Sequence, residues 1–322
     1  MTVLEQARKL EAEGRQQAAA ALIANAASAG EPNALFQLAC WRLFGVNGSR
    51  DLDAAHELLG RAGRAGHVEA LRLQAILVGN GTGCAARPEK ALEMLKRIRT
   101  RDAYAALQLG LIKKMRPEKE AARLSVGILS GRPSIRAVRG LFTPEECRYV
   151  MALAEPHLQP STVIDPATGT LVPHPVRTSS GMSFGPTQED LVIHRINRRL
   201  AAVTSTQVGW GEPLHVLQYA PGQQYRPHMD AVPGLANQRH WTVLVYLNEG
   251  YGGGATRFEL CGVEFTGQTG DALVFRNVDE AGRADPLTRH SGLPVTGGVK
   301  WLATRWIRGA PYHPWTAPDA PR

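Results

Sequence analysis

The chain has 322 residues, of which 43% are hydrophobic and 20% are charged. These proportions are those of a folded globular protein and exclude a disordered or fibrous chain, and a prior of one domain per roughly 150 residues predicts two domains. The 37 Lys and Arg residues outnumber the 29 Asp and Glu residues, and most of this excess falls on residues 1–125, with 19 basic against 13 acidic residues.

The sequence gives no sign of a membrane segment or a disulfide framework. Its apolar runs are much shorter than the roughly 18 residues of a membrane span, and its N-terminus lacks the apolar core of a secretion signal. The four cysteines form no CxxC pair and have no regular spacing. We therefore expect a cytoplasmic protein with reduced cysteines and no membrane contact. Basic clusters at 96–101 and 113–119 are interpreted as solvated helix faces, because no nucleic-acid motif accompanies them.

The first third of the chain repeats itself with a step of 36 residues. Gly30 recurs as Gly66 at this step. Three further series follow the same step: Ala34-Leu35, Ala70-Leu71 and Ala106-Leu107; Ala19, Ala55 and Ala91; Ile23, Leu59 and Leu95. Small residues let paired helices approach closely, and the Ile and Leu series supplies a buried stripe. The pattern resembles the Sel1-like branch of tetratricopeptide repeats. Such arrays hold peptides or serve as structural appendages, and the sequence leaves both roles open.

The region 120–140 contains Gly and Pro but no long periodic helix, so we place the domain junction there. The predicted domains are 1–125, a helical repeat array, and 126–322. The second domain opens with a predicted helix in which Thr143 is the cap, Pro144 the first helical residue and Glu146 the partner in a capping box. A second helix is predicted over 187–204.

Short β patterns then dominate the sequence. They lie at 214–219, 241–248, 256–260, 263–266, 271–275 and 300–307. Short strands separated by Gly-rich turns indicate a barrel or sandwich rather than a parallel α/β sheet.

Candidate metal ligands lie in two longer runs, 217–232 and 285–307. His228 and Asp230 are separated by one residue, so on a strand their side chains point to the same face. His290 offers a third ligand, and two histidines with one carboxylate form the facial triad of non-heme Fe(II) oxygenases. Lys300 follows ten residues later in a largely apolar strand, where it could hold the distal carboxylate of a dicarboxylate cosubstrate.

A series of separate motifs in one order resembles the prolyl 4-hydroxylase family of Fe(II)- and 2-oxoglutarate-dependent dioxygenases, over about residues 135–310. The matching elements are Tyr219, Pro221-Gly222-Gln223, Tyr225, His228, Asp230, Tyr246-Leu247-Asn248, Gly252-Gly253, Thr256, Phe258, Gly270-Asp271-Ala272, Asp285-Pro286, His290, Gly292, Pro294-Val295, Gly298, Lys300-Trp301, Ala303 and Trp306. The resemblance implies a double-stranded β-helix, or jelly roll, with flanking helices. Together with the repeats, this gives an α+β multidomain protein.

The resemblance also implies a role for individual residues. It makes His228, Asp230 and His290 the iron ligands. Lys300 and Tyr219 then hold the distal carboxylate of 2-oxoglutarate, and Thr256 lines the cosubstrate pocket. Arg239 and Trp306 border the substrate cleft, and these two are our candidate catalytic residues.

Two departures concern the substrate. Ala255 stands where the family usually has an acidic residue before Thr256, and the loop over 159–176, which commonly folds over substrate, has no alignment with the family. The segment 177–180 does match an Arg-Thr-Ser motif of the family.

The implied cofactors are Fe(II), 2-oxoglutarate and O2, with ascorbate as a candidate reductant, and the products include succinate and CO2. We interpret the chain as a hydroxylase of prolyl residues in a peptide or protein. An alternative is the same chemistry on a free or carrier-bound amino acid. A third interpretation, a catalytically silent repeat adaptor, conflicts with the intact triad and Lys300. The sequence does not identify the substrate, the hydroxylated carbon or the oligomeric state.

Overall fold

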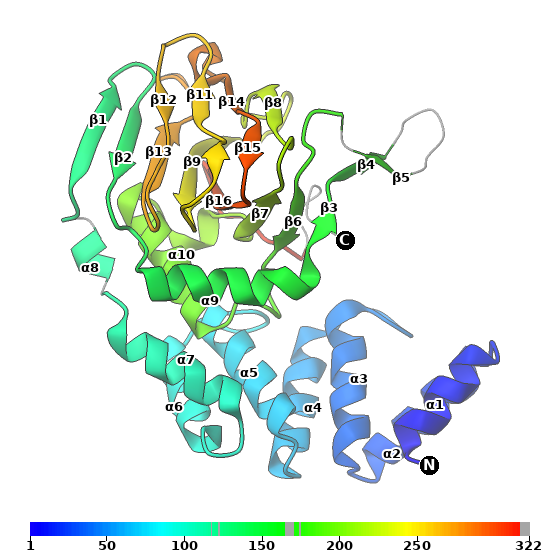
Figure 1. Ribbon diagram of the computed structural model, residues 1–322. Coiled ribbons are helices and arrows are strands. Elements are labelled where there is room, and N and C mark those ends of the chain that lie inside the picture. Colours follow the sequence, from blue (N-terminus) through cyan, green and yellow to red (C-terminus); the bar gives the residue numbers. More distant parts are fainter. Residues whose placement is uncertain (117, 122, 165–170, 174, 316–322) are drawn as a thin grey trace. The chain divides into compact units, whose positions relative to one another are not determined.

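The computed structural model describes residues 1–116, 118–121, 123–164, 171–173 and 175–315 (Figure 1). The chain divides into two compact units. The first comprises Met1–Lys114 with Pro186–His194, and the second comprises Met115–Gly185 with Arg195–Arg322. Among the described residues, none of the helices combines the length and the apolar character that crossing a membrane requires.

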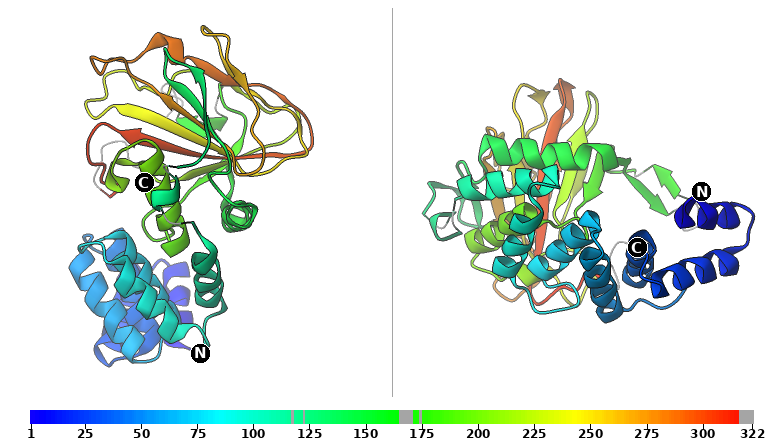
Figure 2. Two further views of the ribbon diagram at one scale, coloured as in Figure 1. Left: turned by 90° about the vertical axis from the view of Figure 1, so that its left-hand side faces the viewer. Right: turned by 90° about the horizontal axis from the view of Figure 1, so that it is seen from below.

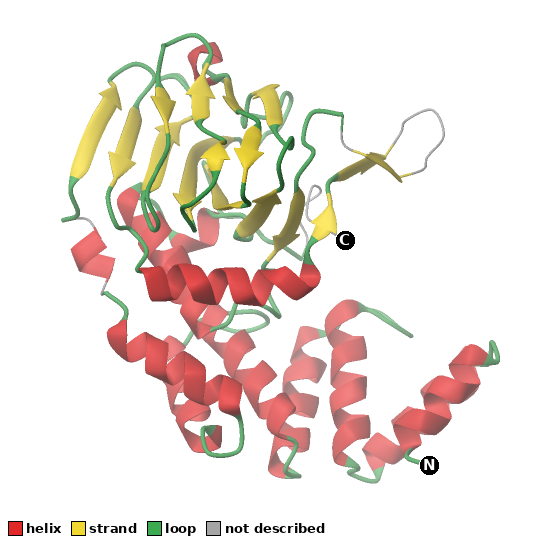
Figure 3. Ribbon diagram, viewed as in Figure 1, coloured by secondary structure: helices red, strands yellow, loops and turns green. Residues whose placement is uncertain are grey.

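Seven helices build the first unit (Figure 3). They are α1 (Val3–Ala12), α2 (Gln16–Ser28), α3 (Pro32–Phe44), α4 (Leu52–Arg64), α5 (Val68–Asn80), α6 (Pro88–Ile98) and α7 (Ala103–Lys114). Each helix packs on the next one in the chain, as expected for stacked helix pairs that bury a continuous core. The predicted helical repeat array is therefore confirmed.

The repeated small and aliphatic residues of α2, α4 and α6 pack as the sequence predicts. The series Ala19, Ala55, Ala91 and the series Ile23, Leu59, Leu95 are fully buried. Helix α7 of the third repeat differs from its counterparts α3 and α5. Leu107 is 55% exposed, and Ala105 is buried in place of the predicted Ala106. Helix α7 begins 35 residues after α5, whereas α5 begins 36 residues after α3. The third repeat is thus one residue short, and the buried positions move by one.

The second unit is built on two layers of antiparallel β-structure (Figure 2). The large sheet has the order β1-β2-β13-β9-β16-β7-β6-β3, and the other layer contains a sheet β12-β11-β14-β8 and the pair β10-β15. The strands of the large sheet are β1 (Val126–Ser130), β2 (Ile135–Val138), β3 (Gln159–Pro160), β6 (Ser180–Ser183), β7 (His215–Tyr219), β9 (Arg239–Tyr246), β13 (Ala272–Arg276) and β16 (Lys300–Arg308). The strands of the other layer are β8 (Tyr225–His228), β10 (Gly252–Gly253), β11 (Thr256–Phe258), β12 (Glu264–Phe265), β14 (His290–Gly292) and β15 (Val295–Gly297).

The apolar core lies between these layers. Tyr246, Phe258 and Phe275 are almost completely buried and belong to one cluster with residues of both sheets. This arrangement confirms the predicted jelly roll, and each β pattern read from the sequence contains an observed strand. The region 120–140, where we placed the domain junction, contains β1 and β2, which extend the edge of the large sheet.

The remaining elements flank the sheets. They are α8 (Glu118–Ala121), α9 (Pro144–Ala154), α10 (Leu191–Val203), the 3-10 turns η1 (Glu155–His157), η2 (Val208–Trp210) and η3 (Pro286–Thr288), and the hairpin of β4 (Thr162–Ile164) and β5 (Leu171–Pro173). The hairpin falls in the predicted substrate loop at 159–176, and residues 165–170 and 174 of that loop lie outside the described residues. Helix α9 packs against β6 and β7.

A buried ion pair joins the start of α9 to α10. Thr143 accepts a hydrogen bond from the backbone of Glu146, and the Glu146 carboxylate accepts one from the backbone of Thr143, which is the predicted capping box. The same carboxylate accepts two hydrogen bonds from Arg199 of α10, at 2.6 and 2.8 Å, and both side chains are 1% exposed. Glu146 thus caps one helix and neutralises a cation on another.

We expect Arg199→Leu to lower the free energy of unfolding by about 3–5 kcal/mol, because it leaves the Glu146 carboxylate buried without its cation. Denaturant unfolding of the full chain measures this loss. Thr143→Ala is the control, since it removes only the cap and costs about 1 kcal/mol. Equal losses in the two variants would contradict the expected importance of the ion pair.

Candidate active site

Backbone pairing brings the three predicted metal ligands together. His228 ends β8, Asp230 follows two residues later, and His290 begins β14 directly opposite His228 in the strand register. The Nε2 atoms of His228 and His290 lie 3.7 and 3.8 Å from the two carboxylate oxygens of Asp230. One nitrogen or oxygen from each residue lies within 4.8 Å of the other two. Among the described residues, this is the one group of His, Cys, Asp and Glu side chains arranged to hold a metal ion.

Backbone carbonyls orient both imidazole rings. Nδ1 of His228 donates to the carbonyl of Arg226 at 2.8 Å, and Nδ1 of His290 donates to the carbonyl of Thr288 at 2.9 Å. A ring whose Nδ1 carries the proton keeps a lone pair on Nε2, which is the atom that faces Asp230 in both cases. The two rings are therefore held in the tautomer that binds metal.

The charges of the triad also suit a divalent cation. Burial, reinforced by His290, lowers the pKa of His228 to about 4, so this imidazole is neutral at pH 7. Burial alone would raise the pKa of Asp230, but the neighbouring His290 and His228 hold it below its usual value. Metal binding requires a neutral imidazole and an ionised carboxylate. Two nitrogen donors and one carboxylate fit Fe(II).

A cavity opens beside the triad, between the two layers. It is lined by Leu217, Tyr219, Tyr225, His228, Asp230, Leu244, Thr256, His290, Gly292, Lys300, Leu302, Thr304 and Trp306. This set includes the three ligands, all three residues assigned to the cosubstrate, and Trp306 from the substrate cleft.

Lys300 is a buried cation on the wall of this cavity. It begins β16 opposite Tyr219 of β7, and it is 3% exposed. Its ammonium donates to the carbonyl of Gly254 at 2.6 Å and lies 5.6 and 5.2 Å from the ring centroids of Tyr219 and Tyr246. None of the described carboxylates forms an ion pair with it. Because an unpaired buried charge is costly, Lys300 indicates a site for an anion.

Thr256 lies in the same wall, on β11. Its hydroxyl is 2.8 Å from the Tyr246 hydroxyl, which donates to the carbonyl of Phe265 at 3.1 Å. Since the tyrosine proton is used in that bond, Thr256 is the donor to Tyr246. This contact fixes the Thr256 side chain beside Lys300 and fits its assignment to the cosubstrate pocket.

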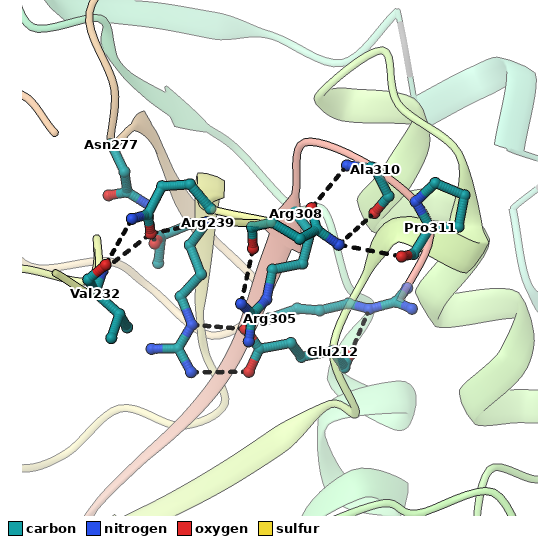
Figure 4. A network of polar contacts seen from close by, with 11 residues as sticks. Glu212, Val232, Arg239, Asn277, Arg305, Arg308, Ala310 and Pro311 are labelled. Atoms are coloured by element: carbon teal, nitrogen blue, oxygen red, sulfur yellow. Dashed lines mark hydrogen bonds and ion pairs between the residues drawn. The ribbon is translucent and has the colours of Figure 1, made fainter. Parts of the chain in front are cut away.

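The two residues expected at the substrate cleft, Trp306 and Arg239, stack on each other. Trp306 lines the cavity, whereas Arg239 does not. The guanidinium of Arg239 stacks over the Trp306 ring, with 4.0 Å from its carbon to the ring centroid. Arg239 also donates from Nε and Nη2 to both carboxylate oxygens of Glu212, at 2.6 and 2.8 Å (Figure 4). The structure thus places Arg239 behind Trp306, held by a carboxylate.

Sequence reasoning missed Glu212 and its second partner. Arg308 places its Nε 2.6 Å from Oε1 of Glu212, so one buried carboxylate lies between two arginines. Nothing in the local sequence around Glu212 distinguishes it from other glutamates. The Arg-Thr-Ser segment, in contrast, matches a motif in the sequence. The backbone of its Arg177 forms an isolated antiparallel β-bridge with Tyr225, and its guanidinium carbon lies 5.7 Å from the centroid of the Tyr225 ring.

The comparisons with known proteins agree with this geometry. The profile of the 2OG-Fe(II) oxygenase superfamily matches residues 214–308. Prolyl 4-hydroxylase 1 of Arabidopsis thaliana is 35% identical over 215 residues, which cover 59% of this chain and 76% of the relative. This chain belongs to the prolyl 4-hydroxylase family. It is accordingly a 2-oxoglutarate-dependent dioxygenase whose cofactors are Fe(II), 2-oxoglutarate and O2.

Two solved structures are similar to separate parts of the chain. One is the viral collagen prolyl hydroxylase of Paramecium Bursaria Chlorella virus-1 in complex with 2-oxoglutarate, with a TM-score of 0.46 and 27% identity, covering 57% of this chain and all of the viral one. The other is a Sel1 repeat protein from Oxalobacter formigenes, with a TM-score of 0.32 and 22% identity, covering 34% of this chain and 85% of that protein.

We expect His228→Ala, Asp230→Ala and His290→Ala each to abolish succinate formation from 2-oxoglutarate, because each removes one of three metal ligands. Succinate release under Fe(II) and O2 is the measurement. His157→Ala, at an exposed histidine of η1, is the matched control and should keep wild-type turnover. Wild-type turnover in any of the three triad variants would contradict the assignment.

The protonation of Lys300 predicts a pH dependence. Burial lowers its pKa to about 7, so the ammonium is charged below that pH and increasingly neutral above it. A bound dicarboxylate favours the charged form. The affinity for 2-oxoglutarate should therefore fall as the pH rises above 7, and binding at pH 8 should take up a proton.

Calorimetry of the Mn(II)-loaded protein in buffers of different ionisation enthalpy measures this proton uptake. Lys300→Met should bind 2-oxoglutarate more weakly and lose the proton uptake. An uptake that persists in Lys300→Met would show that another group titrates.

Proposed function

We propose that the chain hydroxylates a prolyl residue in a peptide or protein, using Fe(II), 2-oxoglutarate and O2. The observation that carries the proposal is the buried, unpaired ammonium of Lys300 in the same cavity as the His228, Asp230 and His290 triad. Iron with its cosubstrate supplies an oxidant that converts an unactivated C–H bond to C–OH, while 2-oxoglutarate becomes succinate and CO2. The protein's own residues hold the ligands, bind the dicarboxylate and position one C–H bond.

The pairing of Arg239 with Glu212 favours a peptide substrate over a free amino acid. A free amino acid carries an α-carboxylate that needs a cation near the reacting carbon, and Lys300 is assigned to the cosubstrate. The Nε and Nη2 donors of Arg239 are both used by Glu212. Its Nη1 has no polar partner among the described residues. Arg239 also lies outside the cavity lining, so Lys300 is the one cationic side chain among the lining residues, and no second cation there receives the α-carboxylate of a free amino acid.

The names of the relatives support the prolyl specificity. The Arabidopsis proteins that match this chain at 33 to 36% identity are named as prolyl 4-hydroxylases or probable prolyl 4-hydroxylases. The alternative, a free or carrier-bound amino acid, lacks such support. The peptide interpretation is therefore the one to test first.

The test is a panel of proline-containing peptides beside free proline, scored by a mass gain of one oxygen coupled to succinate. We expect hydroxylated peptides and unmodified free proline. Arg239→Lys keeps the charge but cannot form the two-pronged contact with Glu212, and it should lower kcat/KM for the peptide without changing 2-oxoglutarate affinity. Preferred turnover of the free amino acid would replace the proposal with the metabolic alternative.

A further inference from the structure

A short chain of hydrogen bonds leads from the metal site into the core of the large sheet. The Thr242 hydroxyl donates to Oδ2 of Asp230 at 2.6 Å. The side-chain amide of Asn277 in turn donates from Nδ2 to the Thr242 hydroxyl at 2.8 Å. Asp230 is 4% exposed, and Thr242 and Asn277 are completely buried. The three side chains therefore interact without competition from solvent.

Backbone contacts fix the positions of Thr242 and Asn277 in the fold. Thr242 lies in the middle of β9, where it pairs with Phe275 of β13 on one side and Trp306 of β16 on the other. Asn277 follows β13 directly. Its backbone N–H donates to the carbonyl of His240 at 2.8 Å, and its carbonyl accepts from Asp285 at 3.0 Å. These backbone contacts fix the positions from which both side chains extend.

The order of donors gives the chain a direction. A threonine hydroxyl has one proton to donate and can accept as well. Because Asn277 presents an N–H to Thr242, the hydroxyl accepts there and its proton is directed to Asp230. An amide turned the other way would place the hydroxyl between two acceptors. The structure keeps the donating orientation although Oδ1 of Asn277 is buried with no hydrogen-bond partner among the described residues, which is a costly arrangement.

The hydrogen bond from Thr242 makes the two carboxylate oxygens of Asp230 different. Oδ2 accepts from Thr242 and lies 3.8 Å from Nε2 of His290, whereas Oδ1 accepts no hydrogen bond from the described residues and lies 3.7 Å from Nε2 of His228. The carboxylate cannot rotate without losing the Thr242 bond. We propose that Thr242 and Asn277 are positioning residues for the metal ligand Asp230. Asn277 orients the Thr242 hydroxyl, and this hydroxyl binds Oδ2 and so leaves Oδ1 available to the metal. This inference rests on the metal site and is independent of which substrate is hydroxylated.

The first test compares Thr242→Val with Thr242→Ser in the full chain. Valine keeps the shape of threonine and removes the hydroxyl, while serine keeps the hydroxyl. Partners of metal ligands typically contribute about 10- to 100-fold to metal affinity, so Thr242→Val should bind Mn(II) weaker by about that factor. Thr242→Ser should bind it close to the wild-type affinity. Calorimetry with Mn(II) alone measures both, and the electron paramagnetic resonance spectrum of bound Mn(II) should change only in the valine variant.

The second test asks whether Asn277 acts through Thr242. Asn277→Ala should also weaken Mn(II) binding, but Thr242→Val with Asn277→Ala should be no weaker than Thr242→Val alone. Losses that add would show that Asn277 acts independently and would overturn the chain of positioning. Wild-type Mn(II) affinity in folded Thr242→Val would overturn the proposal as a whole. If circular dichroism shows that Thr242→Val does not fold, Asn277→Ala decides, and wild-type affinity in that variant overturns it.

These outcomes are separate from those of the proposed function. A failure to hydroxylate prolyl peptides leaves the Mn(II) affinities unaffected. Conversely, an unchanged Mn(II) affinity in the variants leaves the peptide assay of the wild-type protein intact.

Discussion

Two cross-strand pairs determine where the reactive groups lie: His290 opposite His228 in the smaller layer, and Lys300 opposite Tyr219 in the large sheet. Side chains alternate along a strand, so a slip of one residue in either pair would turn these groups to the outside of the sandwich. The register of β14 shifts between His290 and Gly292. This irregularity allows His290 to face its partner while Gly292 lies opposite Tyr225. The chemistry of the site thus depends on backbone hydrogen bonds before it depends on any side chain.

The partners of the buried cations differ between structural residues and the residue assigned to the cosubstrate. Arg199 is neutralised by Glu146, and Arg239 and Arg308 share Glu212. Lys300 is as deeply buried and has no such carboxylate among the described residues. Arg305 is also 3% exposed, but it donates to three backbone carbonyls, whereas Lys300 donates, among the described residues, to the carbonyl of Gly254 alone. A buried lysine with so few partners favours an anionic ligand beside it. That contrast makes Lys300 more informative than its position in a motif alone.

The sequence predicted what depends on local pattern. Hydrophobic periodicity indicated the helices and strands, and the spacing of His228 and Asp230 indicated the first two ligands. The contacts of Glu212 were not predictable, because its partner Arg239 lies 27 residues away and the pair forms only when the segment between η2 and β7 packs beside β9. The third repeat illustrates the same limit. The identity of Ala106-Leu107 suggested a strict 36-residue step, but the shortened connection before α7 moves burial to Ala105.

The arginine cluster beside the cavity also influences the metal ligands through its charge. Glu212 carries one negative charge between Arg239 and Arg308, so the trio retains a net positive charge behind Trp306. Burial, followed by the nearby Arg177 and Arg239, lowers the pKa of His215 to about 3. Arg177 acts in the same direction on the ligand His228, and Arg239 helps to keep Asp230 ionised.

This positive potential disfavours protonation of the imidazoles around the cavity. A proton that bound to a ligand histidine would compete with the metal. The same potential favours a dianionic cosubstrate, since both of its carboxylates enter a region of positive charge. Arg177 thus adds to the effect of burial in keeping His228 neutral, and Arg239 adds to the effect of the neighbouring histidines in keeping Asp230 ionised.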